Sequence, residues 1–409
     1  MTAGLINKYG PWVSGEHFFD REAELKHLIG LLDEGNSILI VAPRRVGKTS
    51  LVREAFRRME ERGQDDLLFV DVQDCSSPQD VIVSLSLAAQ PYTHLWTKVT
   101  DTFTVFFRQV ESVQIPDTFG IKLREGLTGD WQAKGQTILH NLSQTDKPLT
   151  ICLDELPIML SRLLQPTTSE PYPSKREAAD VFLSWLRQMM LQHQDKLRFI
   201  VCGSIGLEPI LKRHRLSHTI TQLRPFPLEP WNRETAESCL NALAECYGLE
   251  WERASLNMLL NKLGSYIPHH VQMFFGMLYE DCEKRKNFRP ASEDVNRVYQ
   301  SSMLSTRGHA ELATYDERLQ RVLEREAVPL ALDLLTEAAM ADGLKVENAR
   351  LLMQRAELAD GEALLSEVLD VLIHDGYLAW NEDRTTLRFV SSLVRDWWKR
   401  SFELKYRPL

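Results

Sequence analysis

Short apolar runs alternate with helical patterns over the first 230 residues of the chain. Residues 37–41 (SILIV) form a β-branched apolar run, and from Lys48 to about Glu60 the apolar positions recur at helical spacing. Similar apolar runs occur at 67–72, 149–153 and 197–201. Uniformly apolar strands separated by helices are typical of a parallel sheet that is covered on both faces. The pattern therefore predicts an α/β domain over residues 1–230.

This alternation weakens over residues 92–147, which we interpret as an insertion in the α/β domain. Residues 105–114 and 119–123 have the pattern of a hairpin. Three glycines interrupt the sequence that follows, namely Gly126, Gly129 and Gly135. The proline-rich stretch 165–174 has the composition of a loop, which could carry contacts with a partner.

The pattern becomes helical after the proline-rich segment 225–230, which we interpret as a hinge. Helical periodicity continues to about Arg285 and resumes from Tyr315. We predict a helical lid domain over residues 231–300.

The last hundred residues combine helices with a terminal hairpin. From Ala331 to Arg400 the pattern indicates three helices, two short strands at 377–380 and 387–390, and a final amphipathic helix. Three helices followed by a β-hairpin are typical of a winged helix. We therefore predict a winged-helix-like domain over residues 301–409, which makes three domains in a chain of 409 residues.

The amino-acid composition argues against several classes of protein. The chain has 48 Lys and Arg against 57 Asp and Glu, a net charge of −9, which argues against a broad, sequence-independent grip on nucleic acid. The 6 cysteines are scattered without a CxxC pair, which predicts reduced thiols and a cytoplasmic protein. No apolar run approaches the ~18 residues of a membrane helix, and the first residues lack a signal-peptide pattern. We expect a soluble protein without a membrane partner.

A phosphate-binding pattern lies between the first strand and the helix that follows it. APRRVGKTS matches GxxxxGK[ST] except at its first position, where Ala42 replaces Gly. Loop N–H groups and the helix N-terminus would surround a β-phosphate, Lys48 would reach the β and γ oxygens, and Thr49 would bind Mg²⁺. The predicted nucleotide-binding residues are Ala42, Pro43, Arg44, Arg45, Val46, Gly47, Lys48, Thr49 and Ser50. We expect Arg44 and Arg45 to point to solvent or to a partner. The alternative is a simple turn with a solvated Lys48.

Polar side chains follow two later strands. Asp154 and Glu155 end the run LTICLDE, at the edge where α/β sheets bind ligands. This is a Walker B pattern, in which Asp154 would hold Mg²⁺ and Glu155 would act as the base toward the attacking water. Ser204 ends the next run, where it would sense the γ-phosphate or simply cap a helix. A solvated strand end is the alternative for the carboxylate pair.

These motifs give the chain a resemblance to the AAA+-like ATPases of the STAND class, particularly the archaeal-ATPase branch. The resemblance rests on FDRE at 19–22, then APRRVGKTSL, CLDE and CGSIG in that order, and it covers about residues 15–275. It implies that Phe19, Arg21 and Glu22 lie near the adenine. The alternative is a helix N-terminus capped by Asp20.

The same resemblance implies further contacts. Pro268, in LGSYIPHH, lies near the position of a family proline that touches the nucleotide, although the spacing departs from that motif. The following histidines, His269 and His270, are weaker candidates, since a histidine at a helix start is commonly either exposed to solvent or hydrogen-bonded in place. Arg213 and Arg215 follow the Ser204 strand at a distance suited to an arginine finger, with Arg215 taken as the catalytic candidate. A surface arginine at a helix end is the simpler alternative.

Together these features predict a Mg²⁺-dependent ATP-binding protein and slow ATPase, in which ATP or ADP sets a conformation and self-association or a protein partner follows. A guanine reader of the NKxD type is absent, since NKLG occupies 261–264. The alternative function is an ATP-regulated DNA-binding or scaffold protein. Residues 301–409 carry 14 basic against 19 acidic residues, which disfavours DNA binding by this domain. The tail from Arg388 onward, however, is basic, and its residues Trp397 and Trp398 could stack on bases. We favour a core position for both tryptophans.

Overall fold

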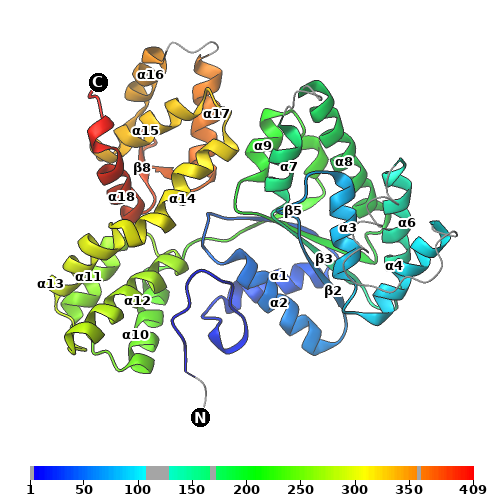
Figure 1. The fold of residues 1–409 in the computed structure, drawn as a ribbon, viewed down its shortest axis with the longest axis horizontal. Coiled ribbons are helices and arrows are strands. Elements are labelled where there is room, and N and C mark those ends of the chain that lie inside the picture. Colours follow the sequence, from blue (N-terminus) through cyan, green and yellow to red (C-terminus); the bar gives the residue numbers. More distant parts are fainter. Residues whose placement is uncertain (1–3, 107–128, 166–171, 357–360) are drawn as a thin grey trace. The chain divides into compact units, whose positions relative to one another are not determined.

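The computed structural model of the protein describes residues 4–106, 129–165, 172–356 and 361–409, which form two compact units (Figure 1). The first, called here the sheet unit, comprises Arg21–Val41 and Leu51–Pro227. The second, the helical unit, comprises the chain up to Asp20, the segment Ala42–Ser50 and Leu228–Leu409. Among the described residues, no helix combines the length and apolarity needed to cross a membrane.

The sheet unit is built on a five-stranded parallel sheet. Its strands are β1 (Ser37–Val41), β2 (Asp66–Asp71), β3 (Leu149–Asp154), β4 (Leu197–Cys202) and β5 (Leu223–Pro227), in the order β2-β3-β4-β1-β5. Every residue of β3 and β4 is buried, as expected for central strands covered on both faces. The first four strands confirm the prediction from the apolar runs, and so the predicted α/β fold class is confirmed as well.

The fifth strand was not predicted from the sequence, and it corrects the interpretation of residues 225–230 as a hinge. The segment interpreted as a hinge begins inside β5, where Pro225 pairs with Leu39 and Pro227 with Val41 in parallel register. Proline interrupts a central strand because it lacks an N–H donor, but β5 is an edge strand. Alternate residues of a strand direct their N–H groups to the same side, so both prolines can face away from β1. The proline spacing is therefore compatible with a strand at this edge.

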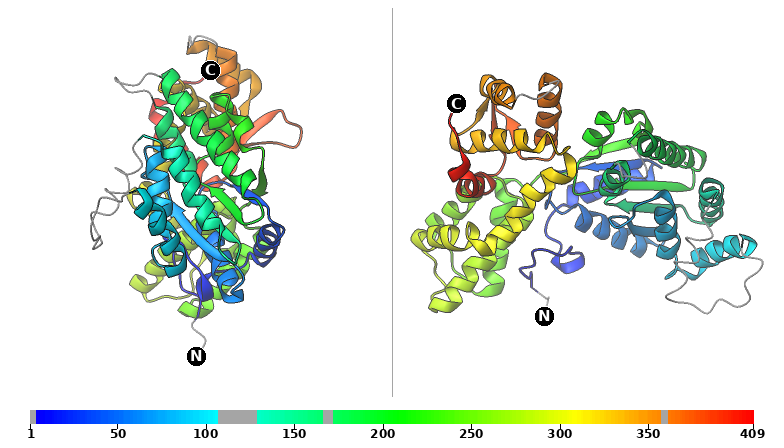
Figure 2. Two further views of the ribbon diagram at one scale, coloured as in Figure 1. Left: turned by 90° about the vertical axis from the view of Figure 1, so that its right-hand side faces the viewer. Right: turned by 45° about the horizontal axis from the view of Figure 1, so that its top comes forward.

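Helices cover both faces of the sheet. α1 (Glu22–Asp33) and α2 (Lys48–Arg62) lie on one face, and α7 (Leu156–Leu164), α8 (Tyr172–Gln192) and α9 (Leu207–Arg213) lie on the other (Figures 1 and 2). This division follows from right-handed crossovers, because β1 to β2 runs along the sheet in the opposite direction to the later connections. The helix α8 begins at Tyr172, within the stretch predicted to be a loop, of which 166–171 lie outside the described residues.

The segment 92–147, interpreted as an insertion, follows α3 (Pro78–Ala88) and contains the helices α4 (Thr93–Phe106) and α6 (Trp131–Ser143). The hairpin predicted from 105 to 123 lies outside the described residues except for its first two positions. Gly135, predicted to interrupt structure, lies inside α6. A β-carbon there would come within 2.6 Å of Ile82 and 2.8 Å of Trp185. Glycine at this position therefore permits close helix packing rather than a break.

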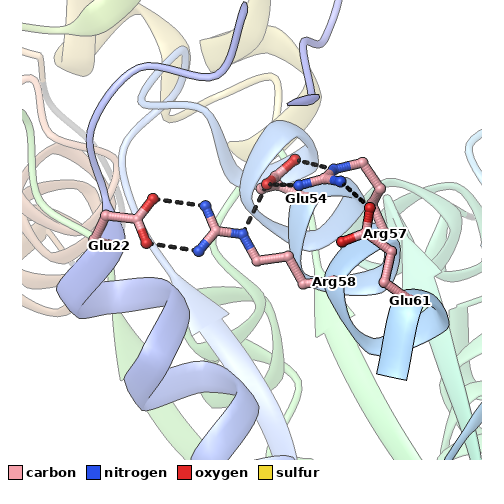
Figure 3. Close-up of polar contacts among 5 residues, drawn as sticks. All are labelled: Glu22, Glu54, Arg57, Arg58 and Glu61. Atoms are coloured by element: carbon pink, nitrogen blue, oxygen red, sulfur yellow. Dashed lines mark hydrogen bonds and ion pairs between the residues drawn. The ribbon is translucent and has the colours of Figure 1, made fainter. Parts of the chain in front are cut away.

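An ion-pair network joins α1 to α2 (Figure 3). Arg58 donates to both carboxylate oxygens of Glu22 at 2.6 Å, and its Nε donates to Glu54 at 2.8 Å. Glu54 is buried and also accepts two hydrogen bonds from Arg57. Glu22 therefore has a structural partner. The proposed cap at Asp20 is wrong, because α1 is preceded by Arg21 in a left-handed conformation, with φ 74°, and without a side-chain cap.

After β5, the helical unit continues with a bundle of helices. Its members are α10 (Arg233–Tyr247), α11 (Arg253–Leu263), α12 (Pro268–Arg285), α13 (Ser292–Val298) and α14 (Thr306–Val322). The apolar side of α12 is wide, since Val271, Phe274 and Leu278 are all fully buried. This part of the chain is helical, as predicted for the sequence that follows the segment 225–230.

The C-terminal part has the predicted winged-helix arrangement. Its elements are α15 (Val328–Met340), β6 (Leu344–Lys345), α16 (Val346–Arg355), α17 (Gly361–His374), β7 (Leu378–Trp380), β8 (Thr386–Phe389) and α18 (Ser392–Phe402), with the antiparallel order β6-β8-β7. Trp397 and Trp398 are 2% and 0% exposed, which confirms their interpretation as core. Their rings are therefore unavailable for stacking on bases.

Candidate functional site

The predicted phosphate loop, here called the phosphate loop for short, leaves β1 at Val41 and enters α2 at Lys48. Arg45 and Gly47 have positive φ values of 68° and 97°, separated by Val46, which is buried. Alternation of the sign of φ turns successive backbone N–H groups toward one concavity, the arrangement that binds anions. Gly47 is required by its φ rather than by crowding, because a β-carbon there would meet no atom within 4 Å. The predicted loop thus has the backbone conformation that phosphate binding needs.

Lys48 is the first residue of α2, and its side chain lies along the loop. Its Nζ donates to the carbonyl oxygens of Ala42 at 3.0 Å and Pro43 at 2.8 Å, and the residue is 8% exposed. A buried ammonium at a helix N-terminus creates a positive site among backbone donors. The alternative of a solvated Lys48 in a simple turn is therefore wrong. Ser50 accepts a hydrogen bond from the backbone N–H of Val13 at 3.1 Å, so its hydroxyl ties the N-terminal segment to α2.

The carboxylate of the predicted Walker B pattern ends the buried strand β3. Asp154 is 7% exposed, and its Oδ1 accepts from the backbone N–H of Glu155 at 3.1 Å and from the thiol of Cys202 at 3.1 Å. Asp154 and Cys202 are also register partners in the pairing of β3 with β4. The carboxylate is therefore oriented by the neighbouring strand as well as by its own turn, so the alternative of a solvated strand end is wrong for Asp154.

Glu155 is held by the residue predicted to be a sensor. Its Oε2 accepts from the backbone N–H of Ser204 at 2.8 Å and from the Ser204 hydroxyl at 3.0 Å. Glu155 has φ 62°, a left-handed conformation that directs the chain from β3 into α7. Gly203 permits this turn, because a β-carbon there would lie 2.6 Å from Pro157 and 3.4 Å from Oε2 of Glu155. Ser204 and Glu155 therefore act as one hydrogen-bonded pair.

Cys202 is the functional candidate that the sequence did not reveal. The sequence indicates only a reduced thiol, and all six cysteines are indeed free. The contact with Cys152, 3.9 Å away, together with burial and the Asp154 carboxylate, raises the pKa of Cys202. The thiol therefore stays protonated and can donate to Asp154. Strand pairing is the signal that could have found it, because the residue before Gly203 must lie beside the last residue of β3.

These groups share one edge of the sheet. β4 lies between β1 and β3, and all three strands are parallel, so their carboxyl ends lie at the same edge. Asp154 ends β3, Cys202 ends β4 and the phosphate loop begins directly after β1. This edge is where open α/β sheets bind ligands.

The described residues form no all-protein metal site. Among the described residues, no group of three or more His, Cys, Asp or Glu side chains could hold a metal ion. Mg²⁺ commonly takes one or two carboxylates together with phosphate oxygens and water. The buried carboxylate of Asp154 is the type of group that supplies one such ligand.

The positions of Arg44 and Arg45 differ from the prediction that both side chains point to solvent or to a partner. Neither points to solvent, because both contact α14 within the helical unit. Arg44 donates to the carbonyl oxygen of Thr314 at 3.3 Å, and Arg45 forms an ion pair with Glu311. Burial lowers the pKa of Arg44, with the nearby Arg45 adding to the effect.

The other predicted nucleotide-binding residues lie in both units. In the helical unit Phe19 packs edge-on against Trp231, with ring centroids 5.9 Å apart, and Pro268 is the first residue of α12. In the sheet unit Arg21 is 6% exposed and donates to Glu24 at 2.6 Å. Arg213 ends α9, and Arg215 beyond it is exposed with φ 57°.

The two lid histidines are buried, so of the two alternatives, exposure to solvent is excluded. His269 and His270 are 8% and 2% exposed. Burial lowers the pKa of both imidazoles, to about 3 for His270. Both side chains are therefore neutral at pH 7 and belong to the interior of the helical unit.

The fold has known relatives among solved structures. The chain is similar to a Walker-type ATPase of Pyrococcus abyssi, with a TM-score of 0.62 and 14% identity over 96% of this chain and 99% of that chain. It is also similar to the Aeropyrum pernix ORC2 protein in its ADPNP-ADP complexes, with a TM-score of 0.54 and 16% identity over 95% of this chain and 98% of that chain. No protein-family model matches, and no curated protein does. The likeness extends over nearly the whole of each chain, and it shows that this chain shares the fold of these two proteins.

Proposed function

We propose that this protein binds ATP with Mg²⁺ and hydrolyses it slowly. The observation that carries the proposal is the edge of the sheet where the phosphate loop leaves β1 while Asp154, Glu155 and Ser204 occupy the ends of the next two strands. Phosphate binding, metal binding and a base are the three parts that phosphoryl transfer to water requires. The similarity in fold to a Walker-type ATPase supports this proposal.

Each residue has a separate role in the proposed mechanism. The loop amides and Lys48 would bind the β and γ phosphates, and Thr49 with Asp154 would hold Mg²⁺, which neutralises charge on the phosphates. Glu155 would accept the proton from the attacking water. Because Ser204 donates two hydrogen bonds to Oε2 of Glu155, it restrains this base, and Oε1 or a rotated carboxylate would face the water.

Cys202 would act through Asp154. Cys202→Ala removes a thiol donor from Asp154, so the Mg²⁺ concentration for half-maximal phosphate release should rise about three- to tenfold. Cys202→Ser should restore part of the loss, since a hydroxyl also donates. Cys152→Ala makes the same volume change in the neighbouring strand, without the contact to Asp154, and should leave the Mg²⁺ requirement near the wild-type value. Equal shifts in both alanine variants would mean that packing alone is responsible.

The helical parts would respond to the nucleotide. We propose that residues 231–300 form a lid and residues 301–409 a winged-helix domain whose positions depend on whether ATP or ADP is bound. This change of position would then alter self-association or the binding of a protein partner. We also propose that the protein is an ATPase of the STAND class, because of the order of the motifs along its sequence.

Phosphate release from ATP tests the activity. The wild-type protein should release phosphate from ATP in Mg²⁺, at a rate well below the ~10 s⁻¹ typical of enzymes, and EDTA should stop it. GTP should be a poorer substrate. Equal release with and without Mg²⁺ would contradict the proposed role of Asp154 and Thr49.

A DNA-binding regulator is the weaker alternative. In winged helices the third helix commonly enters the major groove, and here α17 carries Glu362, Glu367 and Asp370 but no lysine or arginine. The tryptophans of the basic tail are buried. Both observations favour a protein surface over a nucleic acid as the partner of this domain.

A further inference from the structure

The phosphate loop is anchored to α14 through Arg45. Within the helical unit the Arg45 guanidinium pairs with Glu311 through Nη2, and its Nη1 lies 3.4 Å from Nδ1 of His269. Nε2 of the same histidine lies 3.4 Å from Glu311. The three side chains therefore form a closed triangle, which joins the loop, the start of α12 and α14.

Burial and charge make this triangle more than a surface contact. The Arg45, Glu311 and His269 side chains are 19%, 35% and 6% exposed. The contact with His269 and the charge of Arg45 lower the pKa of Glu311 to about 2, while burial lowers the pKa of His269. At pH 7 the histidine is thus neutral and the glutamate ionised. The tautomer with hydrogen on Nε2 lets His269 accept from Arg45 and face Glu311 with its donor.

A second set of contacts fixes the preceding residues of the loop. Arg44 donates to the Thr314 carbonyl, one turn of α14 beyond Glu311. A β-carbon on Gly376 would lie 3.0 Å from Cβ of Pro43, so the turn between α17 and β7 packs closely on the loop. That turn is itself joined to α14 by the buried pair Asp375–Arg318 at 3.3 Å.

The pairing has an electrostatic consequence. Arg45 stands on a loop whose backbone is arranged for a phosphate, yet its charge is compensated by Glu311. A carboxylate beside this loop also lowers the local positive potential, which disfavours an anion carrying several charges. Separation of α14 from the loop would leave Arg45 with an uncompensated charge next to the phosphate-binding backbone.

We propose that Glu311 is a positioning residue that holds Arg45 on α14 as an inhibitory latch, and that a triphosphate competes with Glu311 for this arginine. The inference rests on the proposed function, since it concerns how the same loop is regulated. A ligand that prefers the released state binds with an apparent affinity reduced by the fraction of protein released. Loss of the latch should therefore tighten ATP binding, and should tighten ADP binding less because ADP lacks the γ-phosphate.

Calorimetry on two matched variants of the full chain tests this expectation. Glu311→Gln removes the charge and keeps the volume, and Glu317→Gln makes the same change at an exposed position of α14. ATP should bind Glu311→Gln about fivefold more tightly than wild type, with a smaller gain for ADP. The control should match wild type. Unchanged or weaker ATP binding by Glu311→Gln would overturn the latch.

Hydrogen exchange separates the latch from the proposed function. In protein without nucleotide, the loop amides from Arg44 to Gly47 should exchange faster in Glu311→Gln than in wild type or Glu317→Gln. Arg45→Gln should have the same effect, and combining it with Glu311→Gln should add nothing, because both changes break one contact. If wild type binds no ATP, the proposed function fails while this exchange still tests the contact. Equal exchange of the loop amides in all variants would contradict the latch, regardless of the ATP affinities.

Discussion

Lys48→Ala is expected to weaken ATP binding at least about 100-fold in a calorimetric titration with Mg²⁺. Charge-assisted hydrogen bonds to phosphate contribute about 1.5–3 kcal/mol each, and Lys48 would make them to two phosphates. The residue begins α2 and lies along the loop through its contacts with Ala42 and Pro43. No other lysine lies within the phosphate loop from Ala42 to Ser50.

The substitution should preserve the fold, because alanine favours helix more than lysine does. Lys26→Ala removes the same charge from an exposed position of α1 and should bind ATP as wild type does. Similar thermal unfolding of the two variants would establish that a loss is local. An ATP affinity of Lys48→Ala within a few-fold of that of Lys26→Ala would mean that the loop does not hold the phosphates.

Glu155→Gln is expected to bind ATP normally while losing about 100-fold or more of the phosphate-release rate. General base catalysis contributes about 10² to 10⁴ in rate, and an amide cannot accept the proton. The amide oxygen can still accept the two hydrogen bonds from Ser204, so the local structure should persist. Single-turnover phosphate release, measured beside ATP affinity, separates the two effects.

Glu177→Gln is the matched control, since Glu177 is exposed on α8. It should release phosphate at the wild-type rate. If Glu155→Gln also retains the parental rate, the role of base must be reassigned to another group. If Glu155→Gln loses ATP binding instead, Glu155 stabilises the local structure at the carboxyl edge of the sheet and has no role in the reaction.

Local signals in the sequence were sufficient for most of the fold and for the chain positions of the site. The run at 37–41, the loop APRRVGKTS and the helix after it are contiguous, so hydrophobic pattern and motif together predict one strand, one turn and one helix. The carboxylate pair after β3 is also local. The terminal hairpin was predictable because its two short apolar strands flank a polar turn.

The features that the sequence did not predict depend on pairing between distant segments. β5 contains two prolines, and only its place at the sheet edge makes them acceptable. Cys202 becomes relevant only because β4 lies beside β3 in a register that brings it to Asp154. Helical periodicity in α6 was obscured by Gly135, whose value lies in contacts with Ile82 and Trp185.

The arginines of the loop show the same limitation at the site. A basic pair in a phosphate-binding motif gives no local sign of its partner, and the partner of Arg45 lies 266 residues further along the chain. The neutral state of His269 and His270 likewise follows from burial in the helical unit, whereas a histidine after a helix-starting proline is equally compatible with exposure.

A calorimetric titration of the purified wild-type chain with ATP in millimolar Mg²⁺ tests the central claim most directly, with thermal unfolding measured in parallel. The account predicts a saturable heat at one site per chain and a higher melting temperature in the presence of the nucleotide. No heat and no thermal protection at millimolar nucleotide would contradict the assignment of the loop around Gly47 and Lys48 as a triphosphate site.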